Sequence, residues 1–321
     1  MTKQHLPFMT FSAYTYNILT EIKELKKDMR NRSVYNEKQQ NGENLSKWSL
    51  FWHLPIVWMI TGAIGIILVD SVFRLLADQT GEITSLLITL TKSFIVIIVY
   101  RLTMKYLARR SISEISRQRA GIEVGMGILT GALFILVSTL IIVAMGGYSL
   151  QWANSVDTIS VLVTSIELAL SAAIVEELIF RGLMFQAIQN WAGDWTALAV
   201  TSLFFGVAHL WNPEATLWSS FAITIEAGVL LGAAFLWRRN LWFVIGLHFA
   251  WNAIEGIIGI PVSGHLIAGL YTVKVNGPAL LTGGDFGLEG SIVPILLSLL
   301  IIIPMLFYAK RKPVPSKEIK S

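Results

Sequence analysis

Three short stretches of this sequence place ionisable or amide side chains at helical spacing inside apolar runs. They read Glu176-Glu177-x-x-x-Arg181, Phe205-x-x-x-His209 and His248-x-x-x-Asn252. A carboxylate or an imidazole can take a proton from a water molecule, and an amide N–H can donate to an oxyanion. These residue types are therefore the parts that water activation and oxyanion stabilisation require.

The spacing within the first stretch separates its two glutamates. Successive residues of a helix are rotated by about 100°, so Glu177 and Arg181 share a face and can form an ion pair. Glu176 is rotated away from that pair. One carboxylate is thus neutralised by the arginine, and the other remains able to accept a proton.

The other two stretches each pair a histidine with a residue one turn away. The ring of Phe205 can pack beside the imidazole of His209, and His248 and Asn252 project from one face of their helix. Taken singly, each polar residue is more simply explained as a buried side chain that bonds a neighbouring helix. Taken together, a base, two imidazoles and an amide on three segments favour one water-containing cavity.

The apolar runs around these stretches predict a polytopic membrane protein of the all-α class. Of the 321 residues 54% are hydrophobic and 14% are charged, whereas a soluble domain carries about 25% charged residues. A helix needs about 20 apolar residues to cross a hydrocarbon core of about 30 Å. Eight segments meet or approach this length, roughly 54–76, 83–100, 124–145, 158–185, 196–211, 220–237, 241–260 and 291–308. We therefore expect about eight transmembrane helices.

The distribution of lysine and arginine predicts the orientation of these helices. Placing the N-terminus inside assigns 22 of the 25 Lys and Arg residues to the inner side: eight in 1–50, six in 101–119, Arg181, two at 238–239 and five in 310–320. Because short cytoplasmic loops carry an excess of Lys and Arg, both termini are predicted to be cytoplasmic. The same placement beside apolar segments argues against nucleic-acid binding.

The chain is predicted to consist of one helical bundle, 51–312, with a polar region on either side. Residues 1–50 form a cytoplasmic region whose apolar residues recur between lysines at helical spacing. This pattern fits an amphipathic helix on an anionic membrane surface and, equally, a solvated cytosolic helix. Residues 313–321 form a cytoplasmic tail. The Gly-rich stretch 261–290 is expected to be an outer loop, in part re-entrant. The sequence contains no cysteine, which excludes disulfides and thiol chemistry.

Other ionisable residues within the predicted spans receive no catalytic role. Such groups cost about 2.5–3.5 kcal/mol each in a membrane and therefore need a partner or a function. We expect Lys92 to pair with Glu167 or Glu226, or to line the cavity. Glu255 follows His248 by seven residues on the same helix face, which suits a supporting contact.

The three stretches, in this order on successive membrane helices, resemble the CPBP family of CAAX-prenyl endoproteases and bacteriocin-processing or self-immunity membrane proteins. The resemblance covers roughly residues 155–260, and no motif position departs from the pattern. It implies the catalytic core of an eight-helix intramembrane endopeptidase. By this analogy the residues divide into a water-activating pair (Glu176 and His209), an oxyanion-binding pair (His248 and Asn252) and supporting residues (Glu177, Arg181 and Phe205).

The resemblance leaves the use of a metal open. Glu176, His209 and His248 are a plausible zinc set, because two histidines and a carboxylate leave one coordination position open. The HExxH motif is absent, however, and a glutamate can activate water without a metal. We favour the metal-free mechanism, which requires no cofactor, and keep zinc as the alternative.

The predicted function is hydrolysis of a peptide bond in a hydrophobic, membrane-associated or lipidated peptide, with membrane lipids as the other partner. Two alternatives stay open. One is a non-enzymatic membrane immunity or scaffold protein, which the resemblance allows. The other is an ion-coupled transporter in which the same groups form an ion pathway, although no internal repeat is visible to support it. The compact chain and its basic inner face favour a bacterial plasma membrane as the location.

Overall fold

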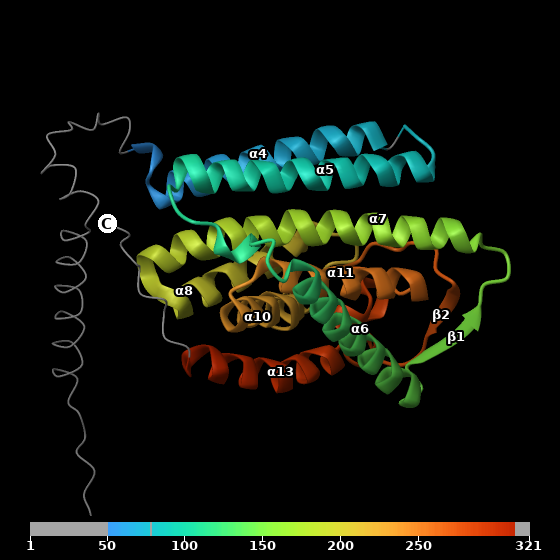
Figure 1. Ribbon diagram of the computed structural model, residues 1–321. Coiled ribbons are helices and arrows are strands. Elements are labelled where there is room, and N and C mark those ends of the chain that lie inside the picture. Colours follow the sequence, from blue (N-terminus) through green and yellow to red (C-terminus); the bar gives the residue numbers. More distant parts are fainter. Residues whose placement is uncertain (1–50, 78, 312–321) are drawn as a thin grey trace, which may run out of the picture. The chain divides into compact units, whose positions relative to one another are not determined.

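The computed structural model describes residues 51–77 and 79–311, and these are mostly helical (Figure 1). The α-helices are α4 (Pro55–Ala77), α5 (Glu82–Leu102), α6 (Ala120–Ala144), α7 (Thr158–Glu177), α8 (Phe185–Ala208), α9 (Leu217–Ile223), α10 (Leu230–Arg238), α11 (Leu241–Ile258), α12 (Ala279–Thr282) and α13 (Ile292–Arg311). Three π-helices are η1 (Thr103–Leu107), η3 (Leu178–Met184) and η5 (Thr224–Val229), and four 3-10 turns are η2 (Ser113–Ile115), η4 (His209–Trp211), η6 (Gly284–Phe286) and η7 (Leu288–Gly290). The strands are β1 (Tyr148–Trp152) and β2 (Tyr271–Val275). All these elements belong to one compact unit that begins at His53, and the predicted all-α class is confirmed.

The membrane-spanning helices follow from the apolar runs. Within the described residues, seven helices are long and apolar enough to cross a membrane. Their outer faces carry large apolar side chains that are more than half exposed, among them Leu68 at 60%, Phe94 at 65% and Leu300 at 69%. A soluble bundle buries such side chains, whereas a membrane helix presents them to lipid. The chain is therefore a multi-pass integral membrane protein, as predicted.

One of the seven helices contains two of the predicted crossings. The helical stretch Thr158–Trp211 is 54 residues long, and at about 1.5 Å per residue it is more than twice as long as a core of about 30 Å requires. Gly193 interrupts it with φ 83° and ψ 174°, which are not helical angles. The chain turns back there, because α8 packs against η3 and lies beside the end of α7 in Figure 1. The seven helices thus provide the eight crossings that the sequence predicts.

Two glycines allow α6 and α11 to approach each other closely. A Cβ atom added to Gly127 would lie 2.1 Å from the carbonyl oxygen of Phe243, and one added to Gly131 would lie 2.3 Å from that of Leu247. Both distances are far below van der Waals contact, so a side chain at either position would push the helices apart. Because Leu247 directly precedes His248, this close packing sets the position of His248 in the bundle.

A two-stranded antiparallel ribbon joins two connections at one end of the bundle. Tyr148 pairs with Val275 and Trp152 pairs with Tyr271, so the ribbon links the α6–α7 connection to the long α11–α13 connection. In Figure 1 it lies at the same end as the turn between α4 and α5. The stretch 261–290, expected to be a loop, therefore also contains β2, α12 and two 3-10 turns. Its order comes from backbone pairing with a distant strand and from glycines with positive φ, neither of which a periodic pattern reveals.

Two predictions concern parts of the chain that lie outside the described residues. These are the amphipathic helix in 1–50 and the cytoplasmic tail 313–321. The cytoplasmic placement of both termini also stays a prediction.

Candidate active site

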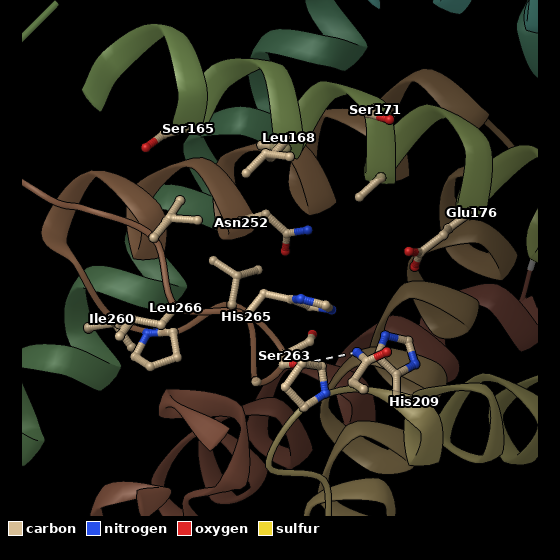
Figure 2. Close-up of a pocket in the computed structure, with 18 of the residues that line it drawn as sticks. Ser165, Leu168, Ser171, Glu176, His209, Asn252, Ile260, Ser263, His265 and Leu266 are labelled. Atoms are coloured by element: carbon tan, nitrogen blue, oxygen red, sulfur yellow. Dashed lines mark hydrogen bonds between the residues drawn. The ribbon is translucent and has the colours of Figure 1, made fainter. Parts of the chain in front are cut away.

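A cavity of about 1230 Å³ lies among α7, α11, the end of α8 and the connection that follows α11. Pockets for drug-sized ligands occupy about 300–1,000 Å³, so this one has room for a short peptide segment. Glu176, His209, His248 and Asn252 all line it. Figure 2 shows Glu176 and Asn252 directed into this space from two helices, with His209 beside them at the end of α8. The structure thus brings together the four residues that the sequence singles out.

Glu177 is the best-anchored residue of this site. Its side chain is fully buried, and its Oε1 accepts hydrogen bonds from Nη1 of Arg181 and from Nδ1 of His248, both at 2.9 Å. The ion pair expected from the i, i+4 spacing is therefore present. Because an ionised carboxylate only accepts, we assign the proton on this side of His248 to Nδ1.

Arg181 also ties the end of α7 to a second distorted helix. Its Nη2 donates to the backbone carbonyl oxygens of Ala227 at 3.1 Å and Gly228 at 3.0 Å. Arg181 lies in the π-helix η3, and both acceptors lie in the π-helix η5. The i→i+5 turn displaces carbonyl groups from the regular α-helical ladder, which lets η5 offer two of them to one guanidinium group, and such distortions are frequent at functional sites. The sequence predicts regular helix at both places.

The ring of Phe205 packs between the arginine and a histidine. The guanidinium carbon of Arg181 lies 4.7 Å from its centroid, and the ring of His209 lies 4.7 Å away at an interplanar angle of 37°. The ring of Phe180 meets it edge-on at 4.9 Å. A cation over an aromatic ring contributes about 0.5–2 kcal/mol, more where water is excluded. Phe205 therefore holds His209 against the buried ion pair, in the contact that the one-turn spacing predicts.

The two histidines use Nδ1 for structural contacts and leave Nε2 for other partners. Nδ1 of His209 lies 2.7 Å from the carbonyl oxygen of Phe205 and must donate, since a carbonyl only accepts. Nε2 of a neutral His209 is then an acceptor. Nε2 of His248 lies 4.0 Å from Oε2 of Glu176.

Glu176 differs from Glu177 in both exposure and partners. Its side chain is 30% exposed, whereas that of Glu177 is 0% exposed. Its Oε2 atom has no hydrogen-bond partner among the described residues, and neither has Oε2 of Glu177, but Oε1 of Glu177 accepts two hydrogen bonds. Of the two adjacent glutamates, Glu176 is thus the carboxylate that reaches the cavity without a fixed partner.

Glu289 is a site residue that sequence reasoning misses. A space of about 10 Å³, close to the size of one water molecule, is lined by His209, His248, Ser263 and Glu289 among others. The Glu289 side chain is buried, and its Oε2 accepts a hydrogen bond from the Ser263 hydroxyl at 2.6 Å. Burial raises the pKa of Glu289, against the opposing effects of the Ser263 hydrogen bond and of His209. Because Glu289 lies in a 3-10 turn of the Gly-rich connection, no helical spacing points to it.

Ser263 fixes the connection after α11 beside the histidines. Its carbonyl oxygen accepts a hydrogen bond from Nδ2 of Asn212 at 3.0 Å, drawn in Figure 2. Its φ of 48° lies in the left-handed region, which few residues other than glycine adopt. Hydrogen bonds to Asn212 and Glu289 thus hold this strained residue in place.

The prediction that Lys92 pairs with Glu167 or Glu226 is wrong. Nζ of Lys92 donates to Oδ1 of Asp70 at 2.8 Å and to the Ser171 hydroxyl at 2.5 Å, although Lys92 does line the cavity as expected. Oε1 of Glu167 instead accepts from Ser85 and Thr89. Asp70 lies near the end of its predicted span. Because α4 and α5 pack together, its carboxylate lies within hydrogen-bonding distance of Lys92.

Glu226 and Glu255 are fully buried, and the polar side chain that interacts with the Glu255 carboxylate is Trp251 rather than His248. Glu255 therefore does not make the expected supporting contact to His248. The described contacts of His248 instead lead to Glu177 and Glu176.

The three candidate zinc ligands, Glu176, His209 and His248, are not arranged as a metal site. In the described part of the chain, no group of three or more His, Cys, Asp or Glu side chains is placed to hold a metal ion. As arranged, Glu176, His209 and His248 thus do not fit a zinc site.

A comparison with protein families matches residues 158–254 to the model described as Rce1-like, type II CAAX prenyl endopeptidase Rce1-like. The matched residues run from the start of α7 into α11 and contain all three motifs. Comparisons with curated proteins and with solved structures gave no match. Residues 158–254 of the chain are therefore similar to the Rce1-like type II CAAX prenyl endopeptidases, which confirms the resemblance to the CAAX proteases and supports an intramembrane CAAX-type protease in general terms.

Proposed function

We propose that this protein cleaves a peptide bond of a hydrophobic, membrane-associated or lipidated peptide with a water molecule activated by Glu176 and His209. The observation that carries the proposal is the convergence of Glu176, His209, His248 and Asn252 on one cavity. The division of labour between the two glutamates adds support. Oε1 of Glu177 accepts hydrogen bonds from an arginine and a histidine, whereas the described polar contact of Glu176 is a 4.0 Å approach to Nε2 of His248.

The first step is attack of water on the scissile carbonyl carbon. As the water oxygen forms the new bond to carbon, its proton passes to the carboxylate of Glu176. Nε2 of His209 can accept the second hydrogen bond of this water, because its Nδ1 is held as a donor by the carbonyl oxygen of Phe205. A base positioned in this way contributes about 10²–10⁴-fold to rate.

The second requirement is stabilisation of the oxyanion that this attack creates. The side-chain amide of Asn252 can donate to it from the cavity wall. Because Nδ1–H of His248 is committed to Glu177, His248 can donate only from Nε2, and it then acts as an imidazolium ion. Removing one oxyanion donor typically costs about 10²–10³-fold in turnover.

Collapse of the tetrahedral intermediate completes the reaction. The carbon–nitrogen bond breaks, and the proton held by Glu176 passes to the departing amine nitrogen. The products are a new carboxyl terminus and a new amine, and Glu176 returns to its ionised form. No oxidant, reductant or further reactant is needed.

The cavity wall supports a hydrophobic substrate. Apolar side chains line it from three parts of the fold, α7, the connection after α11, and the ribbon: Leu168, Ala172, Val175, Ile260, Leu266, Ile267, Val273 and Val275. An extended apolar segment bound against them would be desolvated, which favours binding by about 25 cal/mol per Å² of apolar surface buried. This wall accommodates a lipid chain as readily as apolar side chains.

We favour a reaction without a metal. Glu176, His209 and His248 are not placed to hold one metal ion together, and the steps above need no metal. The measurement is cleavage after dialysis against a chelator. We expect the rate to be unchanged, provided that the melting temperature is unchanged too. A loss of cleavage that added zinc restores would contradict the metal-free reaction and would mean that a metal takes part in activating the water.

The decisive experiment measures cleavage of an internally quenched apolar peptide by the protein in liposomes. Wild type is compared with Glu176→Gln and His209→Ala, and Glu82→Gln is the matched control. Glu82 lies outside the cavity and accepts a hydrogen bond from Ser160, which glutamine can also accept. We expect Glu82→Gln to cleave like wild type and the other two variants to lose activity.

Normal cleavage by Glu176→Gln and His209→Ala would contradict the proposal. In that case ion uptake by the same liposomes tests the transporter alternative. Binding of a target without turnover tests the immunity or scaffold alternative.

A further inference from the structure

The catalytic cavity is lined by connections from one end of the bundle. Residues 212–214, 259–267 and 284–285 contribute to its wall, as do Tyr148, Val273 and Val275 of the ribbon. All of these belong to the α8–α9, α6–α7 and α11–α13 connections or to the helix ends that meet them. Within the described residues, no lining residue comes from the connections at the opposite end, 103–119, 186–195 and 239–240. The cavity therefore opens toward one end of the bundle.

Successive crossings run in opposite directions, so their order determines at which end of the bundle each connection lies. The chain turns at Gly193, so α7 and the second half of α8 run in opposite directions. With this reversal included, the connections after α4, after α6, after α8 and after α11 share one end. In Figure 1 the α4–α5 turn, β1 and β2 lie at the same end of the bundle. The remaining connections and the end of α13 share the other.

Charge distinguishes the two ends sharply. The four connections at the cavity end, 78–81, 145–157, 212–216 and 259–291, contain one Lys or Arg residue, Lys274, and the helix ends that meet them add Arg74 in the last turn of α4. The connection 103–119 alone contains five, and basic residues also end α10 and α13. Short connections rich in Lys and Arg stay on the cytoplasmic side of a membrane. The cavity end is thus the end that this rule places away from the cytoplasm.

We propose that the catalytic cavity opens on the membrane face opposite the cytoplasm and that its substrates are apolar peptides reaching it from that face. The orientation stands on the geometry and the charges alone. The statement about substrates rests, in addition, on the proposed function. It restricts the substrate class to exported or externally encountered peptides and to extracytoplasmic segments of membrane proteins.

The absence of cysteine from the chain allows a direct test of orientation. Single cysteines are introduced at Leu266, which lines the cavity and is 76% exposed, and at Ala172, which lines it one turn before Glu176. Gln118→Cys, exposed in the connection at the opposite end, is the matched control. Each full-length variant is treated in intact cells with a membrane-impermeant maleimide, before and after permeabilisation.

We expect Leu266→Cys and Ala172→Cys to be labelled in intact cells and Gln118→Cys to be labelled only after permeabilisation. Labelling of Gln118→Cys in intact cells, or of Leu266→Cys only after permeabilisation, would overturn the proposed orientation. Because Ala172→Cys is the deeper position, slower labelling there than at Leu266→Cys agrees with the proposal.

A second arm separates the orientation from the chemistry. Sealed vesicles with the outer face outward receive an internally quenched apolar peptide that carries a charged, impermeant tag. We expect cleavage by wild type and none by Glu176→Gln. If the labelling is as expected but no vesicle preparation cleaves the peptide, even after opening, the proposed function fails and the orientation stands. Cleavage only after the vesicles are opened would leave the function standing and overturn the access route.

Discussion

The imidazole of His248 bridges two glutamates that are adjacent in the sequence: its Nδ1 lies 2.9 Å from Oε1 of Glu177, and its Nε2 lies 4.0 Å from Oε2 of Glu176. The two carboxylates meet the same ring from different environments. Glu177 is fully buried and paired with Arg181, and Glu176 reaches the cavity. Substitutions at these two neighbouring positions should therefore have different consequences.

Glu176→Gln preserves the size of the side chain and removes the carboxylate base. We expect cleavage to fall by about 10²–10⁴-fold. The melting temperature should stay close to that of wild type, because the side chain is partly exposed and its Oε2 has no hydrogen-bond partner to lose. Initial cleavage rates and thermal unfolding in the same detergent measure the two effects. A variant with the wild-type rate rules out Glu176 as the base.

Arg181→Met should instead act on stability. It leaves Glu177 charged and buried without its partner, and breaking a buried ion pair in this way costs about 3–5 kcal/mol. The double variant Glu177→Gln/Arg181→Met removes both charges, so we expect it to unfold at a higher temperature than Arg181→Met alone. Thermal unfolding of the two variants is the measurement. If the double variant is no more stable than the single one, the two residues do not stabilise the fold as a pair.

Glu289→Gln should change how stability depends on pH. Burial raises the pKa of Glu289 above the usual value of 4.5, so the folded protein keeps a proton there that the unfolded chain releases. Wild-type stability therefore falls as pH rises from about 4.5 toward the raised pKa. Glutamine can still accept the Ser263 hydrogen bond but cannot ionise.

For that reason we expect Glu289→Gln to gain stability relative to wild type at pH 8 and to gain less at pH 4.5. Melting temperatures of both proteins across this range test the prediction. Glu289→Ala, which loses the hydrogen bond at every pH, is the control. Parallel pH profiles for wild type and Glu289→Gln would show that Glu289 ionises as freely in the fold as in the unfolded chain.

Gly131→Ala should disturb the packing that positions His248. The added methyl group would approach the carbonyl oxygen of Leu247 to 2.3 Å, and overpacking of this kind costs about 1–3 kcal/mol or more. Gly125→Ala lies on the same helix with nothing within 4 Å of the added atom. We expect Gly125→Ala to be neutral or stabilising by about 1 kcal/mol, and Gly131→Ala to lower both the melting temperature and the cleavage rate. Equal behaviour of the two variants would mean that α6 and α11 can separate without consequence.

The crossings and the motif residues could be predicted because both rest on local patterns. Apolar length identifies a span, and i, i+4 spacing brings Glu177 to Arg181 and Phe205 to His209, contacts that the structure contains. The meeting of three helices at one cavity was inferred from the chemistry of the residues, not from any contact pattern. Their roles in a reaction stay a proposal.

The contacts that escaped prediction join positions far apart in the chain. Lys92 bonds Asp70, and Glu289 bonds Ser263. Neither pairing produces a periodic pattern in the sequence, because each depends on how separate helices or connections pack. The π-helix after Glu177 escaped for a different reason: a single turn of i→i+5 bonding has no distinct sequence signature.

The β1–β2 ribbon gives the cavity one wall that is held by main-chain hydrogen bonds. Tyr148, Val273 and Val275 line the cavity from this ribbon, while its register is set by backbone pairing between 148–152 and 271–275. Exchanges among β-forming residues at these three positions would reshape the wall and leave the ladder intact. The helices that carry Glu176 and His248 do not have this freedom, since Glu177 on the first is hydrogen-bonded to His248 on the second. Preference for different peptides can therefore evolve, or be engineered, at the ribbon without altering the residues proposed to carry out the cleavage.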